Sequence, residues 1–357
     1  MGVRQAVIGG SVILAVPVLL VLAVGGARDA AESRDWRADP DISSEVRASA
    51  TDSTYGRMWI QMRNVDLHID QTQALGIREL RGEVVRTQPD VPAALDDSKS
   101  FTVRVTRGTV SLSGDALAAL LNGFVFAYKG APLKHLHART AGSQVVLRGV
   151  MHKGVDLPFE ITSTIALDPD GRVRLHPTKT RILGIDGAKL MRALGLNLNK
   201  MLDLRGAKGV AVVDNDLLLE ATKILPPPAI EARLSAVGVE GDRIVQTFVT
   251  LPEDSVFERY ARPDTAARNF IYFRGGQLRF GKLLMSDTDL DIIDADERDA
   301  FDLYLDQYAR QLVAGVSRTM PNKGLRVIMP DYRRVITPAL QPSVGAAGRM
   351  AILTRAQ

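Results

Sequence analysis

Residues 6–26 form a run of twenty-one residues without a charged side chain, whereas charged residues recur throughout the rest of the chain. A helix of about 20 apolar residues spans the roughly 30 Å hydrocarbon core of a bilayer. The remainder of the chain mixes charged and apolar residues too closely to enter that core. We therefore expect a membrane segment at the amino end and a strand-rich body outside the bilayer.

The membrane segment has two interpretations. A cleaved secretory signal has a basic start, an apolar core of roughly 7 to 15 residues and small residues at the cleavage site. Arg4 provides a basic start and residues 23–27 a candidate cleavage site, but the apolar run is longer than most signal cores. We favour an uncleaved single-pass anchor in the inner membrane. The body then lies in the periplasm, or is secreted if the segment is cleaved.

The orientation across the membrane is less constrained. Arg28, Arg34 and Arg37 follow the apolar run, and only Arg4 and the amino terminus oppose them. Because basic residues favour the cytoplasmic side, these arginines weaken the argument for a periplasmic body. A cytoplasmic body stays open as the alternative.

Composition excludes several classes of protein. Cysteine is absent, so no disulfide framework, thiol chemistry or zinc ribbon is available. The net charge is +4, with acids and bases interspersed and 5% aromatic residues, so we predict no nucleic-acid partner. Hydrophobic residues make up 46% of the chain, which is enough for a substantial core.

Apolar residues at every second position predict that most of the body consists of strands. The alternation begins near residue 58 and contains one slip of the kind that a bulge produces. Further strands are predicted at 77–85, 101–105, 133–138, 144–151, 157–167, 173–183, 209–213, 217–221, 230–237, 243–251, 269–273, 278–284, 289–294 and 325–329. The turns between the middle strands are short, which favours antiparallel pairing.

Three helices are predicted. The first covers 116–128 after a cap at Ser113 or Asp115, and it is apolar on nearly every side, so it should be buried on nearly every side. The second covers 187–204, with apolar residues spaced by three and four. The third covers about 295–314 and ends at Gly315.

Two segments resemble the tubular lipid-binding (TULIP) superfamily. They are 110–121 (VSLSGDALAALL) and 168–175 (DPDGRVRL), followed by a helix and strands. Within the superfamily, the chain looks most similar to a bacterial branch of secreted envelope proteins that bind phospholipid. The resemblance covers about 65–249 and implies a curved antiparallel sheet around a long helix, with acyl chains in the gap. Residues 262–330 have no counterpart in that branch.

We therefore predict an α+β fold, in which a curved antiparallel sheet wraps around a long apolar helix. A membrane helix precedes it, and a β-hairpin and helix extension follows it. The predicted parts are a transmembrane anchor or signal at 1–26, a linker at 27–53, a lipid-binding-like domain at 54–252, an extension at 253–337 and a disordered tail at 338–357.

The predicted lipid site consists of the apolar faces of the first two helices. Its residues are Leu117, Leu120, Leu121, Phe124, Val125, Tyr128, Leu190, Met191, Leu194, Leu198 and Met201. Lys129, Lys134 and Arg139 follow the first helix and are predicted to meet a headgroup at the cavity mouth. The alternative is that the apolar residues form an ordinary core without a ligand.

Two clusters invite a metal-site interpretation. The acidic run 286–297 suggests calcium, but Ile292 stands where an EF-hand loop needs glycine and Arg298 where it needs a bidentate glutamate. We favour an alternating strand followed by acids at a helix start. His135 and His137 share one face of a strand but lack a third ligand at a supporting spacing. No metal and no cofactor are predicted.

No catalytic residue is predicted, because the nucleophile-elbow, zinc-protease, Walker and dinucleotide motifs are absent from the sequence. The predicted function is the binding of membrane phospholipid through its acyl chains, as a carrier or presenter in the cell envelope. The second hypothesis is a non-catalytic scaffold, with 262–330 contacting an envelope protein. The third is a hydrolase of envelope glycan or lipid, since paired acids need not be close in sequence.

Overall fold

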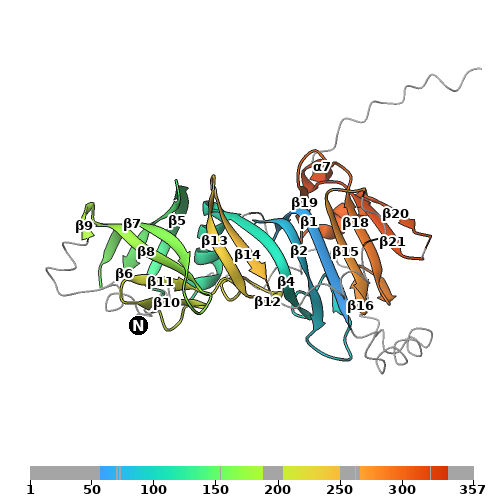
Figure 1. Cartoon of the computed structure of the whole chain (residues 1–357), viewed down its shortest axis with the longest axis horizontal. Coiled ribbons are helices and arrows are strands. Elements are labelled where there is room, and N and C mark those ends of the chain that lie inside the picture. Colours follow the sequence, from blue (N-terminus) through green and yellow to red (C-terminus); the bar gives the residue numbers. More distant parts are fainter. Residues whose placement is uncertain are drawn as a thin grey trace, which may run out of the picture.

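The computed structural model describes residues 57–69, 71, 74–152, 154–187, 204–249, 262, 266–321 and 323–336. Figure 1 shows an elongated arrangement, with a seven-stranded sheet at one end and an eleven-stranded sheet across the middle and the other end. The predicted membrane segment, linker, tail and nearly all of the second helix lie outside the described residues. Within them, no helix has the length and apolarity that crossing a membrane requires.

The eleven-stranded sheet, here the larger sheet, joins strands from both halves of the chain. Its order is β13 (Leu234–Glu240), β14 (Arg243–Val249), β4 (Phe101–Ser113), β2 (Ala74–Arg86), β1 (Met58–His68), β15 (Phe270–Gly275), β18 (Asp289–Asp294), β21 (Leu325–Met329) and β20 (Val316–Thr319). Two short strands pair in parallel beside this path, β12 (Ala229–Glu231) with β4 and β19 (Phe301–Tyr304) with β1.

The seven-stranded sheet, here the smaller sheet, is an antiparallel meander. Its order is β10 (Val210–Val213), β11 (Asp216–Leu219), β8 (Val173–Ile182), β7 (Asp156–Leu167), β6 (Gln144–His152) and β5 (Leu133–Ala141), with β9 (Ile185–Asp186) beside β8. A third sheet contains β17 (Leu283–Ser286), β16 (Gln277–Phe280) and β3 (Ala93–Ala94). The predicted antiparallel pairing of the middle strands is confirmed.

The predicted slip in the first strand is also confirmed. Asn64 adopts a left-handed backbone with a φ of 51°, which asparagine tolerates better than most residues. Ile60 and Met62 face the inner side of the larger sheet before the slip, and Leu67 and Ile69 face it afterwards. The slip therefore keeps both halves of β1 directed at the same apolar layer.

The predicted long helix is wrong. Its place is taken by α2 (Gly114–Leu120) and the π-helical turn η2 (Leu121–Val125). The predicted cap is correct, because the Ser113 side chain accepts a hydrogen bond from the Ala116 N–H at 3.1 Å. Asn122 ties η2 to β5 by donating to the Leu136 carbonyl at 2.7 Å and accepting from the Leu136 N–H at 2.9 Å.

This short helix is not wrapped by a sheet. It follows β4 of the larger sheet and packs on β5 of the smaller one. A segment held between two sheets must be apolar all round, just as a long central helix must, so composition does not distinguish the two. The predicted α+β class is therefore wrong, since the described part of the chain is mostly β-structure with short helices.

The predicted third helix, 295–314, is wrong as well. Its first half contains β19, in which Phe301 lies opposite Val65 and Leu303 opposite Leu67 of β1. Helix α6 (Tyr308–Ala314) covers the second half and ends at Gly315 as predicted. The predicted strand 278–284 is a hairpin of β16 and β17, with Gly281 in its turn at a φ of 60°. A last short helix, α7 (Tyr332–Ile336), follows β21.

The larger sheet runs across the predicted domain boundary at residue 252. β15, from the carboxyl-terminal side of that boundary, pairs antiparallel with β1, so that Ile271 lies opposite Met62. A buried ion pair adds to this region, because Arg262 donates to both carboxylate oxygens of Asp291 at 2.6 and 3.0 Å. Backbone pairing and buried charge thus tie the carboxyl-terminal strands to the first strand of the fold.

Candidate apolar binding site

The inner face of the larger sheet lines an open cavity, whose empty space amounts to about 1500 Å³ when the solvent at its opening is included. Side chains from alternate positions of β1, β2, β4, β14, β15 and β18 form its main wall. They include Ile60, Met62, Leu67, Ile77, Leu80, Val103, Val105, Val110, Leu112, Phe248, Ile271, Phe273 and Ile292. The period-two pattern of these strands therefore creates one continuous apolar surface.

A second wall comes from the connection between the two sheets. Residues 224–228 and Ile230 line the cavity, and three of them are consecutive prolines. Proline has no backbone N–H, so this wall presents fewer polar groups than an ordinary loop. β12 holds the connection in place, because Ile230 pairs with Val103 of β4.

The cavity is long. On β4 alone, its lining extends from Phe101 to Leu112. At about 3.3 Å per residue, this stretch of strand is roughly 35 Å long. One leaflet of a bilayer contributes about half of the roughly 30 Å hydrocarbon core. The cavity is therefore long enough to hold an extended acyl chain along β4.

Hardly any polar group faces this space. Among the described lining residues, the polar side chains are those of Ser98 and Gln246, and none is charged. Water in this cavity would find few hydrogen-bond partners, so an apolar ligand could displace it at little cost in free energy. The surface therefore suits hydrocarbon and disfavours an ionic group.

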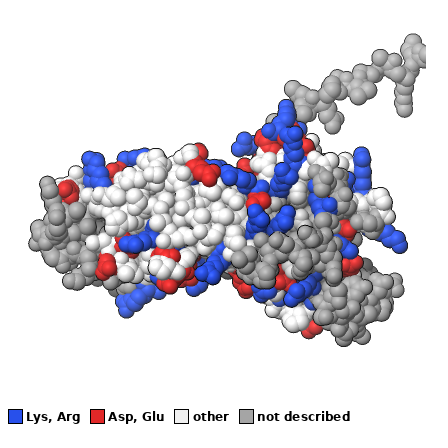
Figure 2. Space-filling model, in the orientation of Figure 1, with Lys and Arg blue, Asp and Glu red and all other residues white. Residues whose placement is uncertain are grey.

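The charged residues of the same strands lie on the other side of the sheet. Arg104 bonds to Glu83 at 3.1 Å and to Glu231 at 2.9 Å, and Arg78 bonds to Glu240 at 3.0 Å. Figure 2 shows basic and acidic side chains together on the surface of this part of the molecule. Charge is thus kept at the solvent face, and the inner face is left apolar.

A smaller hollow of about 700 Å³ lies on the smaller sheet. Its wall is mostly apolar and includes Leu133, Val145, Leu147, Met151, Phe159, Ile161, Leu175, Ile182 and Leu217. Ser163, Thr180 and Asn215 add polar groups. It is therefore smaller than the cavity of the larger sheet.

The structure separates the predicted site residues into three groups. Leu117, Leu120, Leu121 and Val125 are buried, and Phe124 and Tyr128 pack against the same core, but of these six only Leu120 lines the larger cavity. Leu190, Met191, Leu194, Leu198 and Met201 lie outside the described residues. Lys129, Lys134 and Arg139 are exposed and line neither cavity.

Many of the residues that do line the cavity fall in predicted strands, but Val110 and Leu112 lie beyond the predicted strand 101–105, and Leu303 and Leu305 lie within the predicted third helix. Alternation in β1, β2 and β4 shows which side chains share a face, as in Val103 and Val105. It does not show whether protein atoms or empty space cover that face. The triple proline at 226–228 is the one further indication, because it predicts a stiff connection beside the strands.

No family model, no curated protein and no solved structure matches this chain. The resemblance to the tubular lipid-binding superfamily therefore stays a prediction that rests on the two sequence segments. The candidate site is argued from its own geometry.

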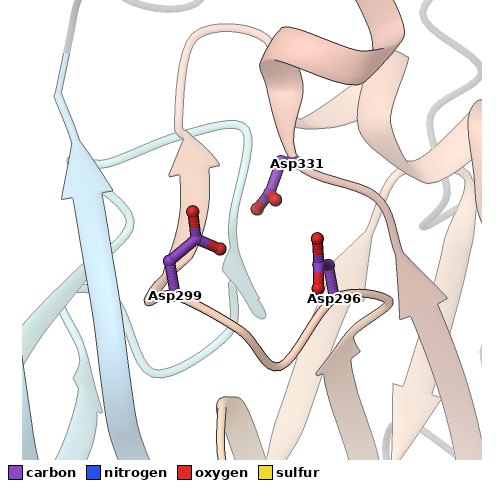
Figure 3. Close-up of side chains that lie close together, drawn as sticks. All are labelled: Asp296, Asp299 and Asp331. Atoms are coloured by element: carbon purple, nitrogen blue, oxygen red, sulfur yellow. The ribbon is translucent and has the colours of Figure 1, made fainter.

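A carboxylate cluster lies in the loops just after β18 and β21 and just before β19. The side chains of Asp296, Asp299 and Asp331 converge from three loop positions (Figure 3), with oxygens within 4.8 Å of one another. Arg298 bonds to Asp296 at 2.6 Å, and this hydrogen bond lowers the Asp296 pKa to about 2. Arg334 contacts the same carboxylate. Two arginine side chains thus already neutralise the Asp296 carboxylate, which would otherwise be available to a metal ion.

The structure places the acidic run and the His pair, the two metal-site patterns found in the sequence, in different surroundings. The acids after β18 do not begin a helix as predicted, because the chain turns at Asp296 and continues into β19. His135 and His137 are both exposed, and neither belongs to the carboxylate cluster. Among the described residues, the His pair therefore gains no third ligand.

Next to this cluster, burial raises the pKa of Asp294 to about 6 from an ordinary value of 3.8. Its oxygens accept from Asn269 at 2.8 Å and from the Asp296 N–H at 2.8 Å, which lessens the shift but does not cancel it. The folded state therefore holds this proton more tightly than the unfolded chain. Stability should fall as the pH rises from about 4 through about 6, and then level off.

We expect the raised pKa of Asp294 to lower the unfolding free energy by about 2 kcal/mol between pH 4.5 and pH 7. Urea unfolding of the wild type and of Asp294→Asn across this range measures the effect, and the variant should show the shallower decline. Asp242→Asn, in an exposed turn, serves as the control and should follow the wild type. Equal slopes in all three proteins would contradict the assignment.

Proposed function

We propose that this protein binds the acyl chains of lipid in the cavity of the larger sheet. The observation that carries the proposal is the long inner face without a charged lining residue among those described. Each methylene group that moves from water into such a surface contributes about 0.8 kcal/mol. A chain of many methylenes can therefore offset the entropy lost on binding, which a small apolar molecule does less readily.

The same lining predicts how a lipid would be oriented. A phosphate or carboxylate drawn into the cavity would lose its hydration without gaining a cationic partner there. The headgroup should therefore stay at the opening while the acyl chain lies along β4. Binding of this kind is passive and involves no covalent step and no nucleotide.

The amino-terminal sequence supports a place at the membrane. An uncharged run at 6–26 would keep the cavity close to a bilayer, which is the source of such lipids. We therefore propose a membrane-tethered carrier or presenter of phospholipid in the cell envelope.

Val110→Trp should block the cavity. Val110 lines it and is half-buried, so an indole can extend into the empty space with little rearrangement of the core. We expect uptake of a fluorescent phospholipid to fall at least tenfold, a change of about 1.4 kcal/mol or more. Native mass spectrometry of the protein purified from the envelope fraction should show co-purified phospholipid in the wild type and little in the variant.

Arg107→Trp is the matched control, because it places the same side chain on β4 at an exposed position. It should bind lipid as the wild type does. A wild-type protein that carries no lipid and takes up none would overturn the proposal and favour the scaffold hypothesis. Equal loss in the two Trp variants would show that Trp disturbs the strand rather than the cavity.

A further inference from the structure

Gln246 is a polar side chain in an apolar row. On β14 its neighbours on the same face are Ile244 and Phe248, both buried. Across the strands it lies opposite Val110 of β4 and Val237 of β13. All four surrounding side chains are thus apolar, at a position where a β-branched residue would pack well.

No hydrogen-bond partner among the described residues explains why the Gln246 amide lies in this apolar row. It lines the cavity and is half-buried, and its side chain makes no hydrogen bond to another described residue. A hydrocarbon lying over the amide would separate it from water and leave it without a hydrogen-bond partner, which weakens binding. A guest with a hydrogen-bonding atom at this point would avoid that weakening.

The position of Gln246 limits the chemistry of such a guest. The other polar lining residue, Ser98, precedes the Phe101 end of β4, whereas Gln246 lies opposite Val110. The nine residue-to-residue steps from Phe101 to Val110 correspond to roughly 30 Å of strand. The cavity therefore fits a ligand with a long apolar chain and one polar atom near one end. It does not fit a ligand that is polar along its whole length.

We propose that Gln246 donates a hydrogen bond from its side-chain amide to the ester carbonyl of an esterified acyl chain, and so selects esterified lipid over plain hydrocarbon. An ester carbonyl accepts a hydrogen bond and carries no charge, so it fits a cavity that has no cation among its described lining residues. A carboxylate would also accept the bond, but its charge would remain unpaired. The inference rests on the proposed function and adds the class of lipid to it.

The test compares two ligands of equal chain length, a long-chain fatty-acid methyl ester and the corresponding alkane. Each competes with a bound fluorescent phospholipid on the wild type, Gln246→Leu and Phe248→Leu. Gln246→Leu should weaken methyl-ester binding about fivefold to tenfold, which is the range expected for one hydrogen bond. Its alkane binding should be unchanged or tighter, because the unsatisfied amide is gone.

Phe248→Leu is the matched control, since it removes apolar contact from the next inward position of β14. It should weaken both ligands by a similar factor. If Gln246→Leu also weakens both equally, Gln246 contributes shape only and the inference fails. If the wild type binds neither ligand and no fluorescent phospholipid, the proposed function itself fails. Thermal unfolding of each variant identifies any loss that comes from misfolding.

Discussion

Asp291→Ala is expected to lower the free energy of unfolding by about 3–5 kcal/mol, the usual effect of removing one partner of a buried ion pair. The Asp291 side chain is fully buried, and that of Arg262 is 3% exposed. The carboxylate also accepts from Arg326 at 3.0 Å. After the substitution, Arg262 would retain a weak bond to the Ala267 carbonyl at 3.5 Å and its position over the Phe270 ring, neither of which replaces a carboxylate.

Urea unfolding of the wild type and the variant measures this loss. Glu240→Ala is the control, because it breaks the exposed pair with Arg78 and should cost less than about 1 kcal/mol. The double substitution Asp291→Ala with Arg262→Met should recover much of the loss, because it removes the unpaired buried charge. A single substitution no more costly than the control would show that the pair does not stabilise this part of the sheet.

Gly114→Ala should destabilise the junction between the two sheets by about 1–3 kcal/mol. Gly114 is the first residue of α2, and a Cβ atom there would lie 2.3 Å from the Ala138 carbonyl oxygen of β5. The Ala138 carbonyl carbon and the Arg139 Cα would each lie at 2.7 Å. All three are backbone atoms, so the helix itself would have to move. The better helix propensity of alanine, about 1 kcal/mol, should not offset that displacement.

Gly238→Ala provides the comparison for the same change of residue. Gly238 lies on β13, and a Cβ atom there would meet nothing within 4 Å. Chemical unfolding should therefore show little change for Gly238→Ala and a clear loss for Gly114→Ala. Similar stabilities of the two variants would mean that α2 can shift on β5 at little cost.

The sequence by itself determined most of the strands and several of their details. Alternation placed β1, β2 and the meander from β5 to β8, including the slip that the structure shows at Asn64. The helix boundaries at Ser113 and Gly315 were also correct. These features depend on contacts among near neighbours in the chain, so local residue types are enough to predict them.

The tertiary structure decided which elements those patterns became. The apolar run after Ser113 became a short helix, because it packs on β5 of the smaller sheet while Leu120 lines the cavity of the larger sheet. The stripe around Phe301 became a strand, because β1 offers it a partner more than 200 residues earlier in the chain. Neither partner can be inferred from the segment itself, since both periodicities place apolar residues on a buried face.

The candidate site shows the same division. The sequence determined that the inward residues of β1, β2 and β4 are apolar, with Gln246 as an exception on β14. Only the tertiary structure decided that these faces line an open cavity, while the predicted residues Leu117 and Leu121 became packed core. The physical reason is that a side chain must be apolar both in a packed core and on the wall of a cavity for an apolar ligand. The two cases differ only in whether other protein atoms come close enough to fill the space over that side chain, and this depends on the tertiary structure.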